Sequence, residues 1–243
     1  MPNHLILEAE GVCKHFGRLQ VLHGVDLQLR RGEALGVVGP NGAGKTTLFG
    51  VLAGTLPASS GSVRLDGQNI DTWDATRRCR VGIARTHQVP RPFLGLSVYE
   101  NTLVAAQHGA GLRGHEAERM VQDSLSRCGL DGMIQRPAAS LGLMDRKRLE
   151  LARALATKPR VLLLDEIGGG LTEAELVTLS ALVASLRDEG LTVVWIEHVL
   201  HALLKVVDRL VCMDAGTVLA QGDPHTVMND PRVVEAYLGG VPA

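Results

Sequence analysis

The sequence has few aromatic residues, few cysteines and almost no net charge. Phe, Trp and Tyr make up 3% of its 243 residues, and 25 basic side chains nearly balance 26 acidic ones. A net charge of −1 gives no whole-chain basic field of the kind used to bind duplex DNA, so we expect no nucleic acid partner. The four cysteines lie far apart and show none of the spacings of zinc sites, which predicts reduced thiols in a cytosolic protein.

Long apolar runs are also missing. No stretch approaches the roughly 18 uncharged apolar residues of a membrane-spanning helix, and the N-terminus lacks the basic and apolar regions of a secretory signal. We therefore expect a chain that is neither secreted nor membrane-spanning by itself. Apolar residues nevertheless make up 45% of the chain, enough for the core of one large α/β domain or of a domain with an inserted lobe.

Short apolar runs alternate with stretches of helical spacing. The runs at 34–38, 161–164, 192–196 and 210–213 are typical of parallel strands that are covered on both faces. Helices are predicted between them, and this alternation indicates a mostly parallel sheet with helices on both faces. Other expected elements are an antiparallel β edge near the N-terminus, further strands and two proline-started terminal helices, at 25–29, 62–65, 81–84, 223–224 and 230–231.

The pattern changes at Ser97. Beyond it, apolar residues recur at helical spacing, with glycine and histidine between two groups of them. We expect a small helical subdomain at about 93–140. In this interpretation residues 1–243 form a single domain, whose core consists of about 1–92 and 141–243.

A glycine-rich stretch after the first buried strand fits the pattern G-x-x-x-x-G-K-[ST] and precedes a predicted helix. In such a P-loop, backbone amides and the helix N-terminus hold phosphates, a lysine reaches the β- and γ-phosphates, and a hydroxyl binds Mg²⁺. Lys45 and Thr46 have these last two roles. The predicted nucleotide-binding residues are Gly39, Pro40, Asn41, Gly42, Ala43, Gly44, Lys45, Thr46 and Thr47.

Two adjacent carboxylates, Asp165 and Glu166, end the apolar run 161–164. In a P-loop NTPase, an aspartate at this position holds the Mg²⁺ shell. A glutamate beside it can orient or deprotonate the attacking water. Two acids here indicate hydrolysis rather than binding alone, although kinases and GTPases share both motifs.

The segment 141–155 decides among these enzymes. It reads LGLMDRKRLELARAL and resembles the signature segment of ABC-transporter ATPases, whose consensus opens LSGGQ. The resemblance extends over almost the whole chain and implies a RecA-like P-loop NTPase core that binds ATP and Mg²⁺. It also implies that the first five residues, here called the signature, contact nucleotide on a second subunit: Leu141, Gly142, Leu143, Met144 and Asp145.

The same resemblance assigns roles to three isolated residues. Phe16 matches an aromatic residue that stacks on adenine. Gln88 matches the Q-loop glutamine, which touches the metal or the water and links the helical subdomain to the core. His198 matches the switch histidine that contacts the γ-phosphate. The implied catalytic residues are thus Glu166, His198 and Gln88, and the implied metal ligands are Thr46, Gln88 and Asp165.

Three stretches, 82–93, 96–101 and 222–239, resemble the ATP-binding subunits of branched-chain amino-acid type importers. This resemblance implies a dimer, with an identical chain or a paralogue, that hydrolyses ATP to import branched-chain amino acids or related small polar solutes such as amides and urea. The implied partners are membrane permease subunits and, indirectly, a periplasmic or extracellular solute-binding protein. The implied location is peripheral, at the cytoplasmic face of the inner (plasma) membrane.

Five positions depart from the family pattern. In the signature, Gly142 replaces serine, Met144 a glycine and Asp145 a glutamine, while Ile167 and Thr172 replace a proline and an aspartate. One interpretation is that this signature covers the nucleotide of the partner subunit less well. In a heterodimer, one of the two ATP sites formed between the subunits would then hydrolyse ATP slowly. The other is a tolerated subfamily variant with normal activity.

Two other functions remain open. A soluble ABC ATPase that acts without a permease usually has two nucleotide domains, long coiled coils or basic extensions, and this sequence has none of them. A nucleotide-dependent assembly partner without hydrolysis would suit the altered signature. The presence of Lys45, Asp165, Glu166 and His198 argues against it.

Overall fold

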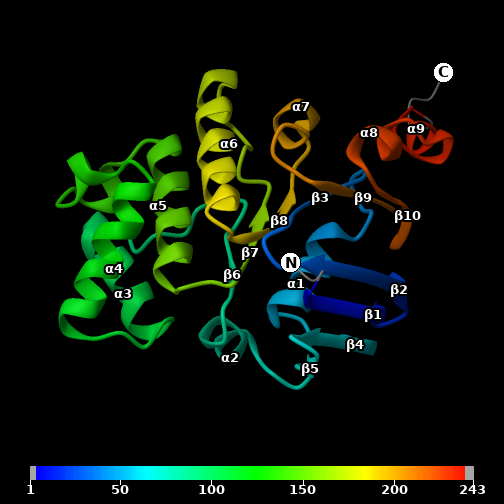
Figure 1. Ribbon diagram of the computed structural model, residues 1–243, viewed down its shortest axis with the longest axis horizontal. Coiled ribbons are helices and arrows are strands. Elements are labelled where there is room, and N and C mark those ends of the chain that lie inside the picture. The colour runs from blue at the N-terminus through cyan, green and yellow to red at the C-terminus, as the bar shows by residue number, and fades with distance from the viewer. Residues whose placement is uncertain (1–3, 239–243) are drawn as a thin grey trace.

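The computed structural model describes residues 4–238, in which a six-stranded sheet forms the centre (Figure 1). Its strand order is β10-β9-β3-β8-β7-β6. All neighbours pair in parallel except β10 and β9. The strands are β3 (Ala34–Val38), β6 (Ile83–Arg85), β7 (Val161–Asp165), β8 (Thr192–Ile196), β9 (Arg209–Asp214) and β10 (Thr217–Gly222).

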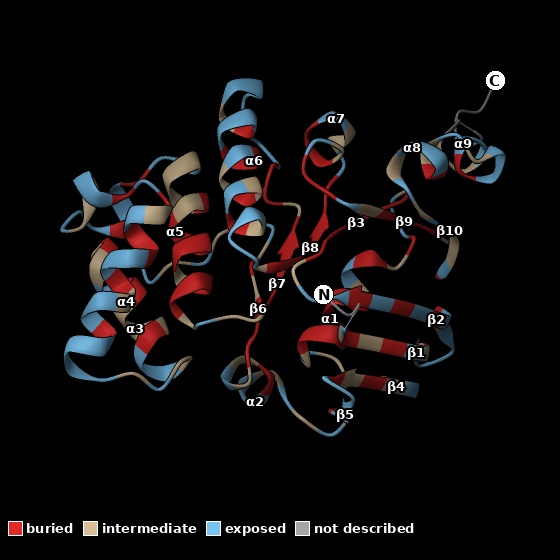
Figure 2. Cartoon of the chain, in the orientation of Figure 1, coloured by how far each residue is buried: buried red, intermediate tan, exposed pale blue. Residues whose placement is uncertain are grey.

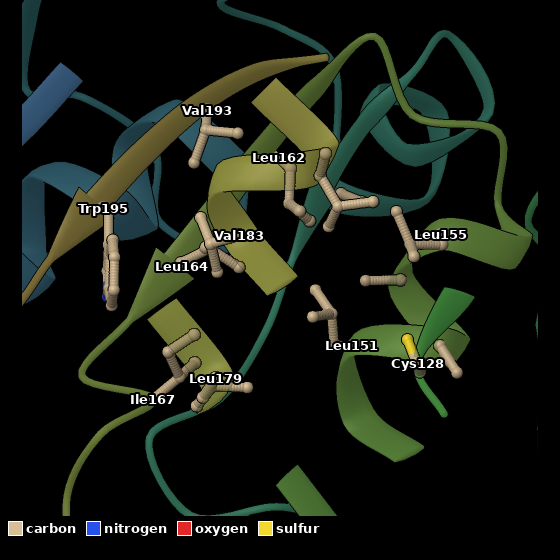
Figure 3. Packing of buried hydrophobic residues seen from close by; sticks show 14 of the residues in the cluster. Cys128, Leu151, Leu155, Leu162, Leu164, Ile167, Leu179, Val183, Val193 and Trp195 are labelled. Atoms are coloured by element: carbon tan, nitrogen blue, oxygen red, sulfur yellow. The ribbon is translucent and has the colours of Figure 1, made fainter. Parts of the chain in front are cut away.

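The central strands are buried on both faces because alternate residues enter two different apolar clusters. In β7, Leu162 and Leu164 belong to one cluster, whereas Val161 and Leu163 belong to the other. Figure 3 shows the first cluster, where the β7 and β8 side chains meet helix α6 (Glu173–Asp188). This two-sided burial explains why these strands read as continuous apolar runs in the sequence.

Helix α1 (Lys45–Ala53) lies between the central sheet and a second, antiparallel sheet, and Figure 2 shows it mostly buried. Seven of its nine residues are buried, including Leu48 and Phe49. The second sheet has the order β2-β1-β4-β5. Its strands are β1 (Leu5–Phe16), β2 (Leu19–Arg30), β4 (Ser60–Leu65) and β5 (Gln68–Asn69). The predicted α/β class, mostly parallel sheet and antiparallel N-terminal edge are confirmed.

Helices α3 (Val98–His108) and α4 (Gly114–Arg127) occupy the segment 93–140, with the short 3₁₀ helices η1 (Asp131–Met133) and η2 (Ala138–Ser140). Helix α5 (Leu143–Ala156) packs against both α3 and α4 and also touches β6. It therefore connects the helical subdomain to the edge of the central sheet.

Four short helices complete the fold: α2 (Ala75–Arg80), α7 (Leu200–Leu203), α8 (Pro224–Met228) and α9 (Pro231–Leu238). The predicted strand at 81–84 is wrong at its start, because Val81 caps α2 and β6 begins at Ile83. The two proline-started helices are confirmed as α8 and α9, and the Asp223 side chain accepts a hydrogen bond from the Thr226 amide. Gly239, at the end of the segment 222–239, lies outside the described residues.

Candidate functional site

The P-loop joins β3 to α1 and, with Val21 and Glu166, lines a cavity. Gly39 has a φ of 146°, and a Cβ atom there would lie 2.0 Å from the Met213 carbonyl oxygen, so only glycine fits. Helix α1 starts at Lys45 with no side-chain cap and no acidic residue in its first turn. Its first backbone amides and positive dipole end therefore suit an anion such as phosphate.

Lys45 is buried beside this cavity. Its Nζ donates hydrogen bonds to the carbonyl oxygens of Gly39, at 2.7 Å, and Pro40, at 3.0 Å. Burial lowers the pKa of Lys45, while the charges of Glu166, Cys212 and Asp165 act in the opposite direction. Both hydrogen-bond acceptors are neutral, so an anion in the cavity would stabilise this ammonium group further.

Asp165 ends β7 and is almost fully buried. Its Oδ2 pairs with Nη2 of Arg85, at the end of β6, over 2.6 Å. The Asp165 backbone amide donates to the Thr86 hydroxyl at 3.3 Å. The Arg85 guanidinium offsets the cost of burying this carboxylate, and carboxylate oxygens are ligands that Mg²⁺ prefers.

Glu166 brings the three predicted catalytic residues together. Its Oε2 accepts a hydrogen bond from Gln88 Nε2 at 2.5 Å, and its Oε1 lies 2.6 Å from His198 Nε2. Glu166 has a φ of 48°, an uncommon conformation for a residue with a side chain, and its amide donates to the Ile196 carbonyl at 2.9 Å. Gln88, Glu166 and His198, which are predicted to be catalytic, are called the trio or the catalytic trio below.

Phe16 lies at the end of β1 and is 46% exposed. The Lys14 ammonium group sits 5.1 Å from the centre of its ring. Phe16 does not line the P-loop cavity, whereas Val21 of β2 does. Stacking of Phe16 on adenine stays a prediction.

The signature forms the start of α5. Leu141 is buried, Gly142 caps the helix without a side-chain hydrogen bond, and Leu143 is 44% exposed. Met144 packs against the main apolar cluster, and the Asp145 carboxylate lies 3.7 Å from Arg148 Nη1 on the same helix. None of these five residues lines the P-loop cavity of the described chain.

Comparison with known families agrees with this geometry. The family model of the ABC transporter matches residues 22–168. The chain belongs to the ABC transporter family. The model of the branched-chain amino acid ATP-binding cassette transporter also matches, at residues 217–243. The predicted family is therefore confirmed, and the protein is an ATP-hydrolysing, nucleotide-binding subunit of an ABC transporter.

Relatives of this ABC ATPase match over nearly their full length. The high-affinity branched-chain amino acid transport ATP-binding protein BraF of Pseudomonas aeruginosa is 38% identical, over 96% of this chain and 98% of that protein. The LivG protein of Escherichia coli, with the same description, is 36% identical over the same shares. A nucleotide-free ATP-binding cassette from an ABC transporter superposes with a TM-score of 0.87 at 30% identity, covering 97% of this chain and 99% of that one.

The residues of the ABC ATPase fit a magnesium ion that shares its ligands with a nucleotide. The described residues contain no cluster of three His, Cys, Asp or Glu side chains that could hold a metal alone. The cavity offers the Thr46 hydroxyl, and Asp165 provides a carboxylate near Lys45. Mg²⁺ is commonly bound by one or two protein oxygens together with phosphate oxygens, so this sparse set suits it.

Two departures from the family pattern have structural roles in the ABC ATPase. Ile167 is buried in the main apolar cluster, where Figure 3 places it beside Leu179 of α6. Thr172 is the N-cap of α6: its hydroxyl accepts the Glu175 amide, and the Glu175 carboxylate accepts the Thr172 amide. Aspartate and threonine are both good N-cap residues, so this replacement preserves the start of the helix.

Sequence reasoning did not identify three charged residues around the trio: Arg85, Lys147 and Glu197. Arg85 pairs with Asp165, whereas Lys147 and Glu197 bind backbone atoms of the trio. Isolated charged residues give no motif, and only their burial distinguishes them. Position 147 did carry a weak signal, because on a helix it shares a face with Met144 and Leu151, three residues before it and four after it.

Proposed function

We propose that this ABC ATPase powers an importer for branched-chain amino acids or related small polar solutes such as amides and urea. The observation that carries the catalytic part is the trio, whose central carboxylate borders the P-loop cavity. The solute class is supported by the names of BraF and LivG and by the match at residues 217–243.

In this proposal the P-loop binds the phosphates of ATP, with Lys45 at the β- and γ-phosphates. Thr46, Asp165 and Gln88 hold Mg²⁺, which neutralises phosphate charge when bound. Glu166 orients or deprotonates the attacking water. Gln88 and His198 keep its carboxylate facing the cavity, and His198 also contacts the γ-phosphate.

A second subunit, identical or a paralogue, completes the site by placing its signature over the P-loop. The position of the signature, away from the cavity of its own chain, supports this arrangement. Met144 packs inward, and Asp145 pairs with Arg148. Both contacts favour a tolerated variant over a damaged lid, because neither replacement leaves an unpaired charge to repel a phosphate.

The permease is proposed to dock in a groove between α2, α3, α5 and the segment around Gln88. Arg85, His87, Arg91, Glu150 and Arg153 help to line it. At its rim Phe93 is 48% exposed, with the Arg153 guanidinium 5.2 Å from the centre of its ring.

No helix of the described residues is long and apolar enough to cross a membrane. Docking on a permease would hold the protein at the cytoplasmic face of the plasma membrane. A solute-binding protein outside the cell would then be an indirect partner.

Replacing Glu166 tests the catalytic assignment. In the assembled complex, Glu166→Gln should lower ATP hydrolysis about 10²- to 10⁴-fold, because a general base is lost, while a labelled ATP analogue still binds. Glu116→Gln, at an exposed position of α4, is the matched control and should hydrolyse ATP normally. Full activity in Glu166→Gln would refute the role of this carboxylate.

The same variant distinguishes the two interpretations of the signature. If the complex contains a paralogue, the equivalent glutamate is replaced there as well, and the two losses of ATP turnover are compared. Equal losses support the tolerated variant. Clearly unequal losses indicate one slow composite site.

A charge at the groove rim tests permease docking. Phe93→Glu should reduce solute uptake by reconstituted vesicles while the basal ATPase rate stays unchanged. Val177→Glu, at an equally exposed apolar position of α6, is the control and should leave uptake intact. Loss of ATP binding in Phe93→Glu would contradict the placement of the groove.

The solute is identified by purifying the tagged subunit from membranes and assaying uptake by the complex that comes with it. Competition among leucine, amides and urea then ranks the candidates. Recovery without any permease would favour a soluble ABC ATPase, and recovery without phosphate release would favour a nucleotide-dependent assembly partner.

A further inference from the structure

Two oppositely charged side chains are buried behind the catalytic trio. Lys147, on α5, is 4% exposed, and Glu197, which follows β8, is 2% exposed. Neither side chain belongs to the P-loop, the signature or the trio. Burying a charge is costly unless hydrogen bonds or an opposite charge compensate it, so each must be explained by what it contacts.

Lys147 binds the backbone of two members of the trio. Its Nζ donates a hydrogen bond to the Gln88 carbonyl oxygen at 2.9 Å, and it lies 3.5 Å from the Glu166 carbonyl oxygen. The side chains of Gln88 and Glu166 are hydrogen-bonded to each other at 2.5 Å. The ammonium group therefore fixes, from the rear, the two backbone segments that present this side-chain pair.

Glu197 binds the backbone of the third member. Its Oε1 accepts a hydrogen bond from the His198 amide at 3.0 Å, and its Oε2 accepts one from the Gly168 amide at 2.9 Å. A Cβ atom on Gly168 would come 2.8 Å from Oε2 and 2.7 Å from Leu176 Cδ1, so a larger residue there would displace one of these side chains. Glu197 thus holds His198 and the turn that follows Glu166.

The two charges also compensate each other. Burial lowers the pKa of Lys147, and the strongest opposing influence is the negative charge of Glu197, followed by that of Glu166. Each charge is therefore less costly while the other is present.

We propose that Lys147 and Glu197 are positioning residues for ATP hydrolysis, which fix the backbone of Gln88, Glu166 and His198. Because Lys147 lies on the helix that begins with the signature, it also makes the position of Gln88 depend on the position of α5. The inference rests on the proposed roles of the trio. It assigns the two residues no contact with nucleotide.

Amide hydrogen exchange of the purified subunit tests the anchoring directly and requires no hydrolysis. In Lys147→Met, peptides covering 86–94 and 166–170 should exchange about 10- to 100-fold faster, the range expected when a hydrogen bond to a charged group is lost. Lys147→Arg retains the charge and should remain close to the wild type. Peptides from β1 and β2 report on global unfolding and should not change.

Kinetics of the assembled complex provide the second readout. Lys147→Met should lower kcat for ATP about 10- to 100-fold, the cost of a misplaced catalytic group, with KM within about twofold of the wild type. Lys147→Arg should restore most of the rate. Lys205→Met, an exposed lysine near α7, is the control and should leave both constants unchanged.

The charge pair is tested with Glu197→Gln. This variant should accelerate exchange at 166–170 and around 198. The double variant Glu197→Gln/Lys147→Met should accelerate exchange and lower kcat by less than the product of the two single effects, because neither buried charge is left without the other. If Lys147→Met does not fold, Lys147→Gln replaces it in every comparison.

Unchanged exchange in a folded Lys147→Met protein would overturn the proposal. A raised KM at constant kcat, or an arginine variant as impaired as the methionine variant, would also overturn it. Failure of the proposed function would give a different result. The wild-type complex would bind ATP without hydrolysing it, while Lys147→Met would still accelerate amide exchange.

Discussion

The carboxyl end of the central sheet and the start of α5 are the two regions expected to meet nucleotide, and they differ in how firmly they are held. At the sheet, Asp165 is ion-paired and Glu166 has partners on both oxygens. At the start of α5, Gly142 makes no side-chain cap and Leu143 is exposed. The first region is fixed within one chain, whereas the second presents open backbone and an exposed apolar side chain.

In the proposed function, the described chain thus holds the residues at the sheet edge in place and leaves the start of α5 open for a second subunit. Preformed donors and carboxylates require little rearrangement when substrate arrives. An exposed helix start can meet a phosphate held by another subunit, in line with the proposed dimer. Substitutions should therefore destabilise the protein strongly at the sheet edge and only weakly at the start of α5.

The largest difference in unfolding free energy between the two regions is expected when alanine replaces one glycine in each. Gly39→Ala places a Cβ atom 2.0 Å from the Met213 carbonyl oxygen at a φ of 146°, and should destabilise the protein by about 3 kcal/mol or more. Gly142→Ala has a φ of −67° and nothing within 4 Å of the added atom, so its unfolding free energy should change by less than about 0.5 kcal/mol. Urea denaturation measures both values. Equal losses would show that the two regions are equally constrained.

A smaller contrast is expected for two ion pairs. Arg85→Met leaves Asp165 buried without its cation and should lower the unfolding free energy by about 2–3 kcal/mol. Arg148→Met removes the partner of Asp145, a pair that is 24% exposed on each side, and should cost less than about 0.5 kcal/mol. Thermal melts of both variants give the difference. A larger loss in Arg148→Met would reverse the comparison.

The smallest contrast concerns helix caps. Thr172→Ala removes the capping hydroxyl of α6 and should cost about 1 kcal/mol. Gly142→Ser adds a hydroxyl at the uncapped start of α5 and should stabilise it by a few tenths of a kcal/mol. Both effects are measured by denaturation at one protein concentration. A lower unfolding free energy in Gly142→Ser would mean that the missing cap does not limit the stability of α5.

Several elements were predictable because their signal is local. The runs in β3, β7 and β8 are apolar at every position, and the P-loop residues are consecutive. Other elements gave weaker signals: α2, ATRRCR, has one buried residue, Arg78, and no apolar period, so the sequence did not predict it. Strand β1 pairs with β2 and β4, and only that pairing explains its length.

From the sequence alone we could predict the buried strands β3, β7 and β8, the order of the motifs, and the resemblance that connects Phe16, Gln88 and His198 to nucleotide chemistry. The meeting of Gln88 and His198 at the Glu166 carboxylate became visible only in the tertiary structure. The same is true of the ion pair between Arg85 and Asp165, and of the hydrogen bonds from Lys147 and Glu197 to backbone atoms of the trio. The physical reason is that a motif consists of neighbours along the chain, whereas the burial of a charge depends on what folds over it. A lysine can be exposed to water in one fold, whereas in another it is buried and donates hydrogen bonds to backbone carbonyl groups.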